Sequence, residues 1–259
     1  MEIKKQKKIM NNESISKVAI QLTSISKTFH LNINRSDSIR TMFFNVFKRQ
    51  NKNKLKALTD INLKIDIGET FGIIGRNGSG KSTLLNIIMD SIRPDKGGSV
   101  NTIGKIMRLS LGIGVDPNLS ARDNIYVNGS LLGLTFKKIG NIFDSILEFA
   151  GIKEFVDTPV KFFSKGMRQR LLFSIAMHAE SDIFLLDEFF GGTGDKDFKK
   201  KSDKAFQDKI IEGKTIIIVS HNLNTIKKYC SRVMWIDKGV CKAIGDPKVI
   251  ITKYKESFN

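Results

Sequence analysis

The sequence contains few cysteines and no long apolar run. Only Cys230 and Cys241 among its 259 residues are cysteines, and their spacing is not that of a metal site. So few thiols exclude a disulfide scaffold and favour a reducing compartment. No stretch of about 18 apolar residues occurs, so we expect no membrane-spanning helix. Residues 1–17 are polar and basic, which predicts a flexible N-terminal segment and no signal peptide.

Acidic residues are also scarce. Lysine and arginine number 43 against 26 aspartates and glutamates, which gives a formal charge of +17. This balance favours a polyanionic partner, such as nucleic acid, an anionic membrane surface or phosphate groups. A solvated surface rich in lysine explains the charge equally well. The length allows a full hydrophobic core, either in one large domain or in a domain with a subdomain.

A glycine-rich segment, residues 75–82, reads Gly-Arg-Asn-Gly-Ser-Gly-Lys-Ser and follows the largely apolar run 71–74. Its spacing matches the pattern G-x-x-x-x-G-K-[ST] of a phosphate-binding loop. The glycines let the backbone wrap closely, so that its N–H groups point at phosphate oxygens. The residues after the loop predict a helix, whose N-terminus also attracts phosphate. A glycine-rich turn that matches by accident is the alternative, and the flanking strand and helix argue against it.

The same segment predicts a nucleotide and Mg²⁺ as cofactors. Lys81 is expected to reach the β- and γ-phosphates and to act in catalysis, and the Ser82 hydroxyl is expected to ligate Mg²⁺. The predicted nucleotide contacts in and after the loop are Gly75, Arg76, Asn77, Gly78, Ser79, Gly80, Lys81, Ser82 and Thr83.

A pair of carboxylates, Asp187 and Glu188, ends the apolar run 183–186, which predicts a buried strand. Asp187 is expected to hold Mg²⁺ opposite Ser82. Neighbouring residues of a strand point to opposite sides, so Glu188 need not share the metal. We expect Glu188 to polarise the water that attacks the γ-phosphate.

A second apolar run, residues 215–219, leads to His221. A single histidine is more often structural than functional. Its position at a strand end, beside the other polar residues of the site, favours the functional interpretation. We therefore expect His221 to contact the γ-phosphate as part of the catalytic site.

Apolar periodicity predicts strands at 18–22 and 58–65, a hairpin over 233–244 and a mostly helical block from about 118 to 180. A segment at about 36–50 predicts a basic amphipathic helix. This helix either packs on its own core or lies against a membrane surface or a partner. The pattern as a whole predicts an α/β fold class with the helical block inserted into it.

Helix boundaries inside the block are marked by capping residues. Ser120, with Asp123 three residues later, is expected to cap one helix. Gly151 is expected to end a second helix. A third helix is predicted from about 166 to 179.

Residues 163–170, Phe-Ser-Lys-Gly-Met-Arg-Gln-Arg, resemble the signature segment of ABC-transporter ATPases, which usually reads Leu-Ser-Gly-Gly-Gln. Together with the phosphate loop, the Asp-Glu strand end and the histidine, this segment resembles the family in order and spacing over about residues 18–245. The form Phe-Ser-x-Gly-Met-x-x-Arg, residues 118–129 and the long insert before Leu58 resemble one group in particular. This group is the ATP-binding subunits of bacterial polysaccharide exporters, which serve O-antigen, capsule and teichoic acid.

The resemblance implies the P-loop NTPase fold of ABC ATPases, with a RecA-like core, an antiparallel β subdomain and an inserted helical subdomain at about 118–180. The ATPase domain would span residues 18–245, and residues 246–259 would form a short C-terminal tail. Some relatives carry a C-terminal carbohydrate-binding domain, and we expect this chain, which stops at Asn259, to lack one. Glycan choice would then lie mainly with the membrane subunit.

The resemblance also implies a head-to-tail homodimer with two ATPs at its interface. Each ATP would contact the phosphate loop of one copy and Ser164 and Gly166 of the other. Ser164 is suited to cap a helix whose positive end points at the γ-phosphate. Phe29, or alternatively His30, would stack on adenine. Asp195 would contact the nucleotide from a later loop.

Three segments depart from the family pattern. Lys165 replaces a small residue of the signature segment. Residues 107–112 lack the usual glutamine, and Ser110 is the best match for that position. The loop that leads to Asp195 is one residue longer than usual. The predicted metal ligands are therefore Ser82, Asp187 and Ser110.

The leading functional hypothesis is an ATP-hydrolysing subunit that powers export of a polysaccharide or lipid-linked glycan through a separate integral-membrane permease. The homodimer would lie peripherally on the cytoplasmic face of the inner membrane, with the helical block against the permease. No nucleic acid is expected as a partner. The alternatives are a soluble ABC ATPase that acts on nucleic acid or ribosomes, and the ATPase of another ABC transporter class, such as an importer or a drug exporter.

Overall fold

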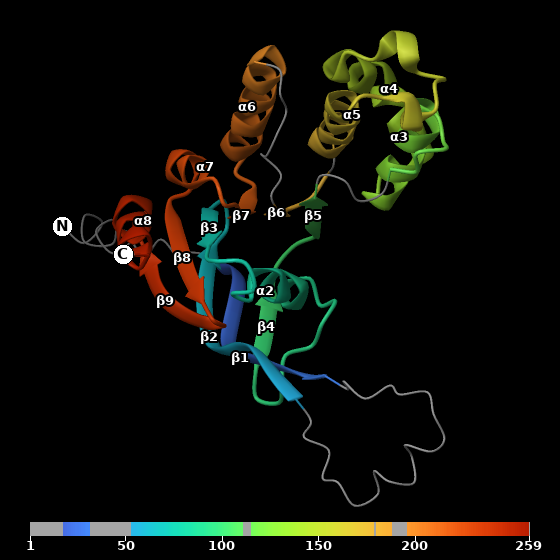
Figure 1. The fold of residues 1–259 in the computed structure, drawn as a ribbon. Coiled ribbons are helices and arrows are strands. Elements are labelled where there is room, and N and C mark those ends of the chain that lie inside the picture. The colour runs from blue at the N-terminus through green and yellow to red at the C-terminus, as the bar shows by residue number, and fades with distance from the viewer. Residues whose placement is uncertain (1–17, 32–52, 111–114, 179, 188–195, 259) are drawn as a thin grey trace, which may run out of the picture.

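The computed structural model describes residues 18–31, 53–110, 115–178, 180–187 and 196–258. These residues form two β-sheets and a helical block (Figure 1). The following sequence predictions lie outside the described residues: the N-terminal segment 1–17, the amphipathic helix at about 36–50, Glu188 and Asp195.

The larger sheet of the described chain has the strand order β5-β6-β7-β3-β8-β9. Its strands are β3 Thr70–Ile74, β5 Ile106–Ser110, β6 Ile183–Asp187, β7 Thr215–Val219, β8 Arg232–Asp237 and β9 Val240–Gly245. All neighbouring pairs are parallel except β8 and β9, which form the predicted hairpin. Every residue of β3 and β7 is buried, in agreement with their largely apolar sequences.

A smaller antiparallel sheet has the order β2-β1-β4. Its strands are β1 Val18–Leu31, β2 Asn53–Asp66 and β4 Ser99–Thr102. β1 and β2 extend beyond the predicted limits 18–22 and 58–65. The extension mixes polar pairs, such as Thr28 with Lys56, with apolar pairs, such as Phe29 with Leu55, and register shifts interrupt it, so the sequence shows no unbroken alternation there.

The core between the two sheets contains α2, Lys81–Ile88 (Figure 1). Leu84 and Ile87 of this helix belong to one buried cluster with Leu63 of the smaller sheet and Ile217 of the larger sheet. Two sheets and a helix thus bury their apolar faces against one another. This packing fixes the start of α2 relative to the strand ends of the larger sheet.

Within the described residues, three helices after β6 cover the other face of the larger sheet, and Phe173 and Ala176 pack beside them. These helices are α6 Lys196–Ile211, α7 Leu223–Tyr229 and α8 Pro247–Glu256. Most of the segment predicted as a C-terminal tail therefore forms α8. Asp246 caps this helix by accepting hydrogen bonds from the N–H groups of Lys248 and Val249, at 2.8 and 3.3 Å. Ile250 and Tyr254 are buried in the core on this face.

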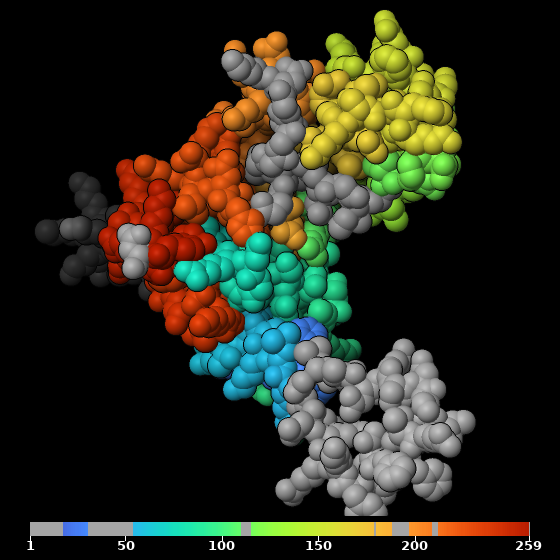
Figure 2. Space-filling model, in the orientation of Figure 1, coloured from blue at the N-terminus to red at the C-terminus, as the bar shows by residue number. Residues whose placement is uncertain are grey.

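The helical block contains α3 Ala121–Leu131, α4 Phe136–Ala150 and α5 Lys165–Met177, with 3-10 turns η2 Lys153–Phe155 and η3 Val160–Phe162. The expected caps are observed: Ser120 accepts a hydrogen bond from the N–H of Asp123 at 3.1 Å, and Gly151 ends α4 with a φ of 63°. The block has its own apolar core and forms a lobe beside the β5 edge of the larger sheet (Figures 1 and 2). Not one of the described helices combines the length and apolarity needed to cross a bilayer.

Both cysteines are shielded from solvent to some degree. Burial raises the pKa of the Cys230 thiol to about 12, and it also raises the pKa of Cys241. A thiol with a raised pKa stays protonated at neutral pH and is a poor nucleophile. We expect iodoacetamide at pH 8 to modify Cys230 more than about tenfold more slowly in the native protein than in urea, as measured by mass spectrometry. Equal rates in the two conditions would contradict this burial.

Candidate nucleotide-binding site

The phosphate loop at residues 75–80 joins the carboxyl end of β3 to the start of α2. A Cβ on Gly75 would lie 2.2 Å from the carbonyl oxygen of Ile236, and one on Gly80 would lie 2.6 Å from that of Ala57. Both distances are far below van der Waals contact, so only glycine lets the loop pass so close to neighbouring backbone. The loop thereby keeps the tight curvature of a phosphate cradle.

The N-terminus of α2 is open to an anion. Gly80 is the N-cap, with a φ of 107°, and it provides no side-chain cap. The first turn of α2 contains no acidic residue. The first N–H groups of a helix lack backbone partners, and the helix dipole favours negative charge there. A phosphate group fits these N–H groups better than any neutral ligand does.

Lys81 lies inside the phosphate loop, with only 8% of its surface exposed. Its Nζ donates hydrogen bonds to the carbonyl oxygens of Gly75, at 2.7 Å, and Arg76, at 2.9 Å. These bonds hold the ammonium group at the cradle, where a phosphate would attract it strongly. Ser82 is exposed and Thr83 is half-buried at the next two positions of α2. The residues of the loop therefore fit the polyphosphate chain of a nucleotide.

The strand order β6-β7-β3 brings the other predicted residues to the same edge of the sheet. Asp187 is the last residue of β6 and lies opposite Val219, the last residue of β7. His221 follows β7 by two residues and is exposed. The carboxyl ends of adjacent parallel strands form the crevice in which α/β proteins bind ligands. Asp187, His221 and the phosphate loop thus lie at or just after the ends of three neighbouring strands, at the edge where such a crevice forms.

Arg108, which the sequence analysis did not single out, forms an ion pair with Asp187. Its Nη2 donates to Asp187 Oδ2, and its Nη1 donates to Asn86 Oδ1 at 2.8 Å. Both partners of the ion pair are largely buried. The signal that would have identified Arg108 is its place on β5, two residues before Ser110, because residues i and i+2 of a strand share a face.

The oxygens of Ser82 and Asp187 are the kind of ligand that Mg²⁺ prefers, so they fit the predicted metal. Ser110 lies opposite Asp187 in the register of β5 and β6. In this structure the Asp187 carboxylate is bound by Arg108. A metal ion would therefore compete with the Arg108 guanidinium for the carboxylate, or share it.

Replacing Arg108 with alanine should lower the melting temperature measured without Mg²⁺ and nucleotide. The largely buried Asp187 carboxylate would lose its cation, which costs about 1–3 kcal/mol, or a shift of a few degrees for a chain of this size. The Mg²⁺ concentration needed for half-maximal stabilisation by ATP should fall, because the competing guanidinium is gone. A thermal-shift titration measures both quantities.

The matched control for that variant is Arg122→Ala, which removes an exposed arginine paired with Asp157. Exposed pairs contribute about 0–1 kcal/mol, so this control should melt close to the unaltered protein. Equal melting temperatures for the Arg108 and Arg122 variants, with the same Mg²⁺ dependence, would show that the Arg108–Asp187 pair has no influence on the metal.

Ser164 caps α5 as predicted, since its Oγ accepts a hydrogen bond from the N–H of Met167 at 3.2 Å. The first turn of α5 also lacks acidic residues, and Gly166 is half-buried there. α5 belongs to the helical block, and its Phe173 and Ala176 pack on the face of β5 and β6 that lies opposite α2. The structure of one chain therefore does not bring Ser164 and Gly166 to the phosphate loop.

Phe29 lies on the part of β1 that extends beyond the predicted strand. Its ring is half-buried, and the ammonium of Lys27 lies 5.7 Å from its centroid. His30 is exposed and pairs with Lys54 of β2. Adjacent strand residues face opposite sides, so only one of Phe29 and His30 can face a given ligand. Adenine stacking by Phe29 stays a prediction.

A glycine-rich cradle at the carboxyl edge of a mainly parallel sheet defines an α/β protein with a P-loop nucleotide site. Residues 58–191, more than half of the chain, match the family described as "ABC transporter". The chain belongs to this family, and membership implies nucleotide binding. The predicted fold class is thereby confirmed.

The most similar relatives include proteins named for export systems. The chain is 41% identical over 215 residues to the "O-antigen export system ATP-binding protein RfbB" of Myxococcus xanthus, covering 82% of this chain and 49% of that protein. It is 37% identical to the "Teichoic acids export ATP-binding protein TagH" of Shouchella clausii, covering 92% and 65%. It thus spans about half to two thirds of these relatives. An RfbB protein of Klebsiella pneumoniae is 36% identical to this chain, and the alignment covers 98% of that protein.

Solved structures support the fold. The dimeric ATP-binding cassette MJ0796 bound to ADP and Pi aligns with a TM-score of 0.69 at 21% identity, covering 88% of this chain and 98% of that chain. A structure described as an ATP-binding subunit of an ABC transporter aligns with the same TM-score at 18% identity, covering 92% and 93%. At such low identity these likenesses concern the fold alone.

Proposed function

We propose that this chain is an ATP-hydrolysing subunit that powers export of a polysaccharide or a lipid-linked glycan. The observation that carries the proposal is the match to the O-antigen export ATP-binding protein of Klebsiella pneumoniae, which covers 92% of this chain and 98% of that protein. A whole protein of similar extent therefore has this named role. The phosphate loop and the neighbouring strand ends supply the parts that such a role requires.

In the proposed reaction the loop N–H groups and Lys81 hold the β- and γ-phosphates of ATP. Ser82 and Asp187 would hold Mg²⁺, and Ser110 lies opposite Asp187 in the register of β5 and β6. When bound between these residues, Mg²⁺ would supply positive charge against the charge that develops on the phosphates. Glu188 polarises the attacking water, and His221 contacts the γ-phosphate.

Two copies of the chain are proposed to share each ATP. The positive end of α5, with its Ser164 cap, carries no acidic residue, and α5 packs on the face of the larger sheet opposite α2. A second copy in head-to-tail orientation would place Ser164 and Gly166 against the γ-phosphate. ATP would then stabilise the pair of subunits, and hydrolysis would release them.

The proposed membrane partner is a permease that contacts the helical block. Large apolar side chains are exposed on this block, among them Leu131, Phe136 and Phe162, each at least 70% exposed. Such residues are common at protein interfaces and unfavourable in water. The charge of +17 suits a position near anionic lipid on the cytoplasmic face of the inner membrane.

The test is to express the chain with a candidate export permease from the same organism and to purify the membrane complex. Co-purification and ATP-dependent movement of the glycan into sealed inverted vesicles are expected, and Lys81→Ala should abolish movement while the complex remains. Glycan movement that continues undiminished with Lys81→Ala would contradict the proposed coupling. A chain that binds no permease would contradict the proposed partner.

A further inference from the structure

A cavity of about 550 Å³ lies beside the phosphate loop. One wall is formed by the loop itself, including Arg76 and Ser79. The opposite wall comes from the β8–β9 hairpin and α8, with Trp235, Asp237 and Tyr254. In Figure 2 the surface of α8 (red) adjoins the surface of the region that contains the phosphate loop (teal). Cavities of this volume are typical of sites for small molecules.

This cavity is distinct from the part of the sheet edge at which Asp187 and His221 lie. In the sheet order β6-β7-β3-β8, the strands that carry Asp187 and lead to His221 lie on one side of β3. Trp235 and Asp237 are on β8, on the other side of β3. The phosphate loop follows β3 and is therefore a shared wall between two separate sites.

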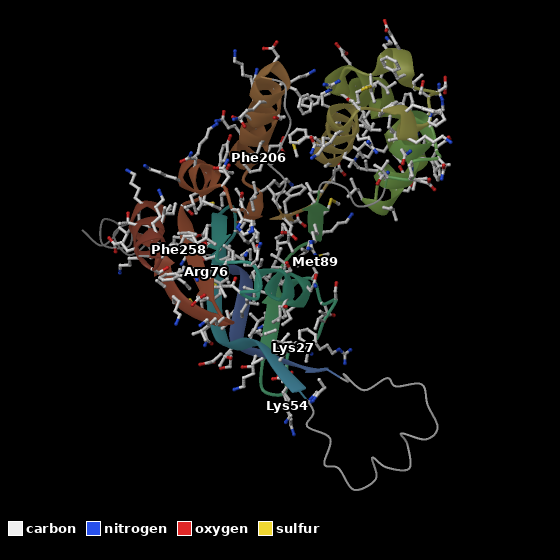
Figure 3. All side chains as sticks on the ribbon, viewed as in Figure 1. Lys27, Lys54, Arg76, Met89, Phe206 and Phe258 are labelled. Carbon is white, nitrogen blue, oxygen red and sulfur yellow. The ribbon has the colours of Figure 1, made fainter. Side chains whose placement is uncertain are left out.

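The cavity has an excess of positive charge. Among the described residues that line it, Arg76, Lys238 and Lys242 are cations and Asp237 is the one carboxylate. Within the described part of the chain, these three cations form no ion pair. The Arg76 guanidinium instead lies 4.2 Å from the ring centroid of Phe258, and both residues are labelled in Figure 3. Unpaired cations around a cavity favour an anionic ligand.

A buried hydroxyl in the same wall has no partner. Ser79 is 3% exposed, and its Oγ forms no hydrogen bond within the described residues. Buried polar atoms are normally hydrogen-bonded, because an unpaired one costs free energy. A ligand oxygen in the cavity would supply the partner. This observation is independent of the charge and points to the same cavity.

The opposite wall adds aromatic rings and a hydrogen-bond acceptor. The Trp235 and Tyr254 rings meet edge to face, with centroids 5.7 Å apart, and Trp235 is half-buried. An aromatic surface binds the apolar face of a ring compound. The Asp237 carboxylate accepts hydrogen bonds, as from sugar hydroxyls.

We propose that this cavity binds a phosphorylated sugar, with the phosphate at Arg76, Lys238 and Lys242, the sugar ring against Trp235 and the hydroxyls at Asp237. Two sources have this chemistry, a glycosyl phosphate and the ribose phosphate of a nucleotide. The assignment does not depend on the proposed export function, because it follows from the cavity alone.

The test uses the fluorescence of Trp235, which is the only tryptophan of the chain. The full chain is first saturated with a non-hydrolysable ATP analogue and Mg²⁺, so that the phosphate loop is filled. Glucose 1-phosphate and AMP are then titrated separately, and the emission of Trp235 is measured. A saturable change with at least one of them is expected, and the stronger binder identifies the source of the ligand.

Glucose and inorganic phosphate are the control ligands, each with only part of the proposed chemistry. Both should bind at least about tenfold more weakly than the better phosphorylated sugar, because each lacks one set of contacts. No saturable change with either phosphorylated sugar would overturn the proposal. Inorganic phosphate that binds as tightly as the better sugar phosphate would overturn it as well.

Charge reversal in the cavity completes the test. Lys242→Glu should weaken binding of the phosphorylated sugar about tenfold or more. Lys253→Glu, on α8 but not part of the cavity wall, makes the same change of charge and should bind normally. If these two variants bind the phosphorylated sugar with equal affinity, the proposed site is wrong. The measurement uses neither hydrolysis nor transport, so failure of the export experiment leaves its result intact.

Discussion

Replacing Lys81 with alanine is expected to lower ATP hydrolysis by at least about 100-fold, which is the typical cost of removing one fixed donor to a transition-state oxygen. ATP affinity should also fall, since charge-assisted hydrogen bonds to the phosphates are lost. Phosphate release and binding of a fluorescent ATP analogue measure the two effects. Lys81 is buried at the cradle and bonded to Gly75 and Arg76, so no other described lysine can take its place without moving the loop.

The control for the Lys81 variant is Lys64→Ala, which removes an exposed lysine of β2 on the outside of the smaller sheet. It should hydrolyse ATP at the unaltered rate. Thermal melting of both variants separates a catalytic loss from unfolding. If the Lys81 variant is folded and still binds and cleaves ATP normally, the phosphate loop is not the nucleotide site.

Mixing two inactive variants should restore hydrolysis if each ATP site uses both copies of the chain. Lys81→Ala removes the phosphate-loop contribution, and Ser164→Arg blocks the start of α5. In a mixed head-to-tail dimer both defects fall in one site, and the other site is intact. Random pairing makes about half of the dimers mixed, so roughly a quarter of the sites should recover.

The controls for the mixture are the two variants measured separately. Both should be nearly inactive, and Ser164→Arg should lose only about 1 kcal/mol of stability from the missing cap. Recovered phosphate release on mixing supports a shared site. If activity stays absent in the mixture while the two variants demonstrably form mixed dimers, each site is built within a single chain and the proposed dimer is wrong.

Local features of the site were predictable because they depend on residues close together in the sequence. The spacing of Gly75, Gly80 and Lys81 indicated the loop, and the structure adds the reason for the glycines in the backbone of Ile236 and Ala57. The caps at Ser120 and Ser164 were predictable on the same ground, since each bonds an N–H three residues later.

Contacts between distant segments were not predictable. The ion pair of Arg108 with Asp187 joins residues 79 positions apart and depends on the pairing of β5 with β6. The contact of Arg76 with Phe258 requires that α8 pack beside the phosphate loop. The spacing of Arg108 and Ser110 marks a shared strand face, but neither pair of partners is marked in the sequence, because a strand pattern does not specify which strand lies next to it.

The sequence by itself determined the phosphate loop, the helix caps, the buried strands and the family of the chain. These features follow from spacings of a few residues, over which backbone geometry and side-chain chemistry are coupled directly. Only the tertiary structure decided the partner of Asp187, the distance of Ser164 from its own phosphate loop and the cavity between this loop and α8. Sheet order and helix packing set these contacts, because they arise when apolar faces of remote segments are buried together.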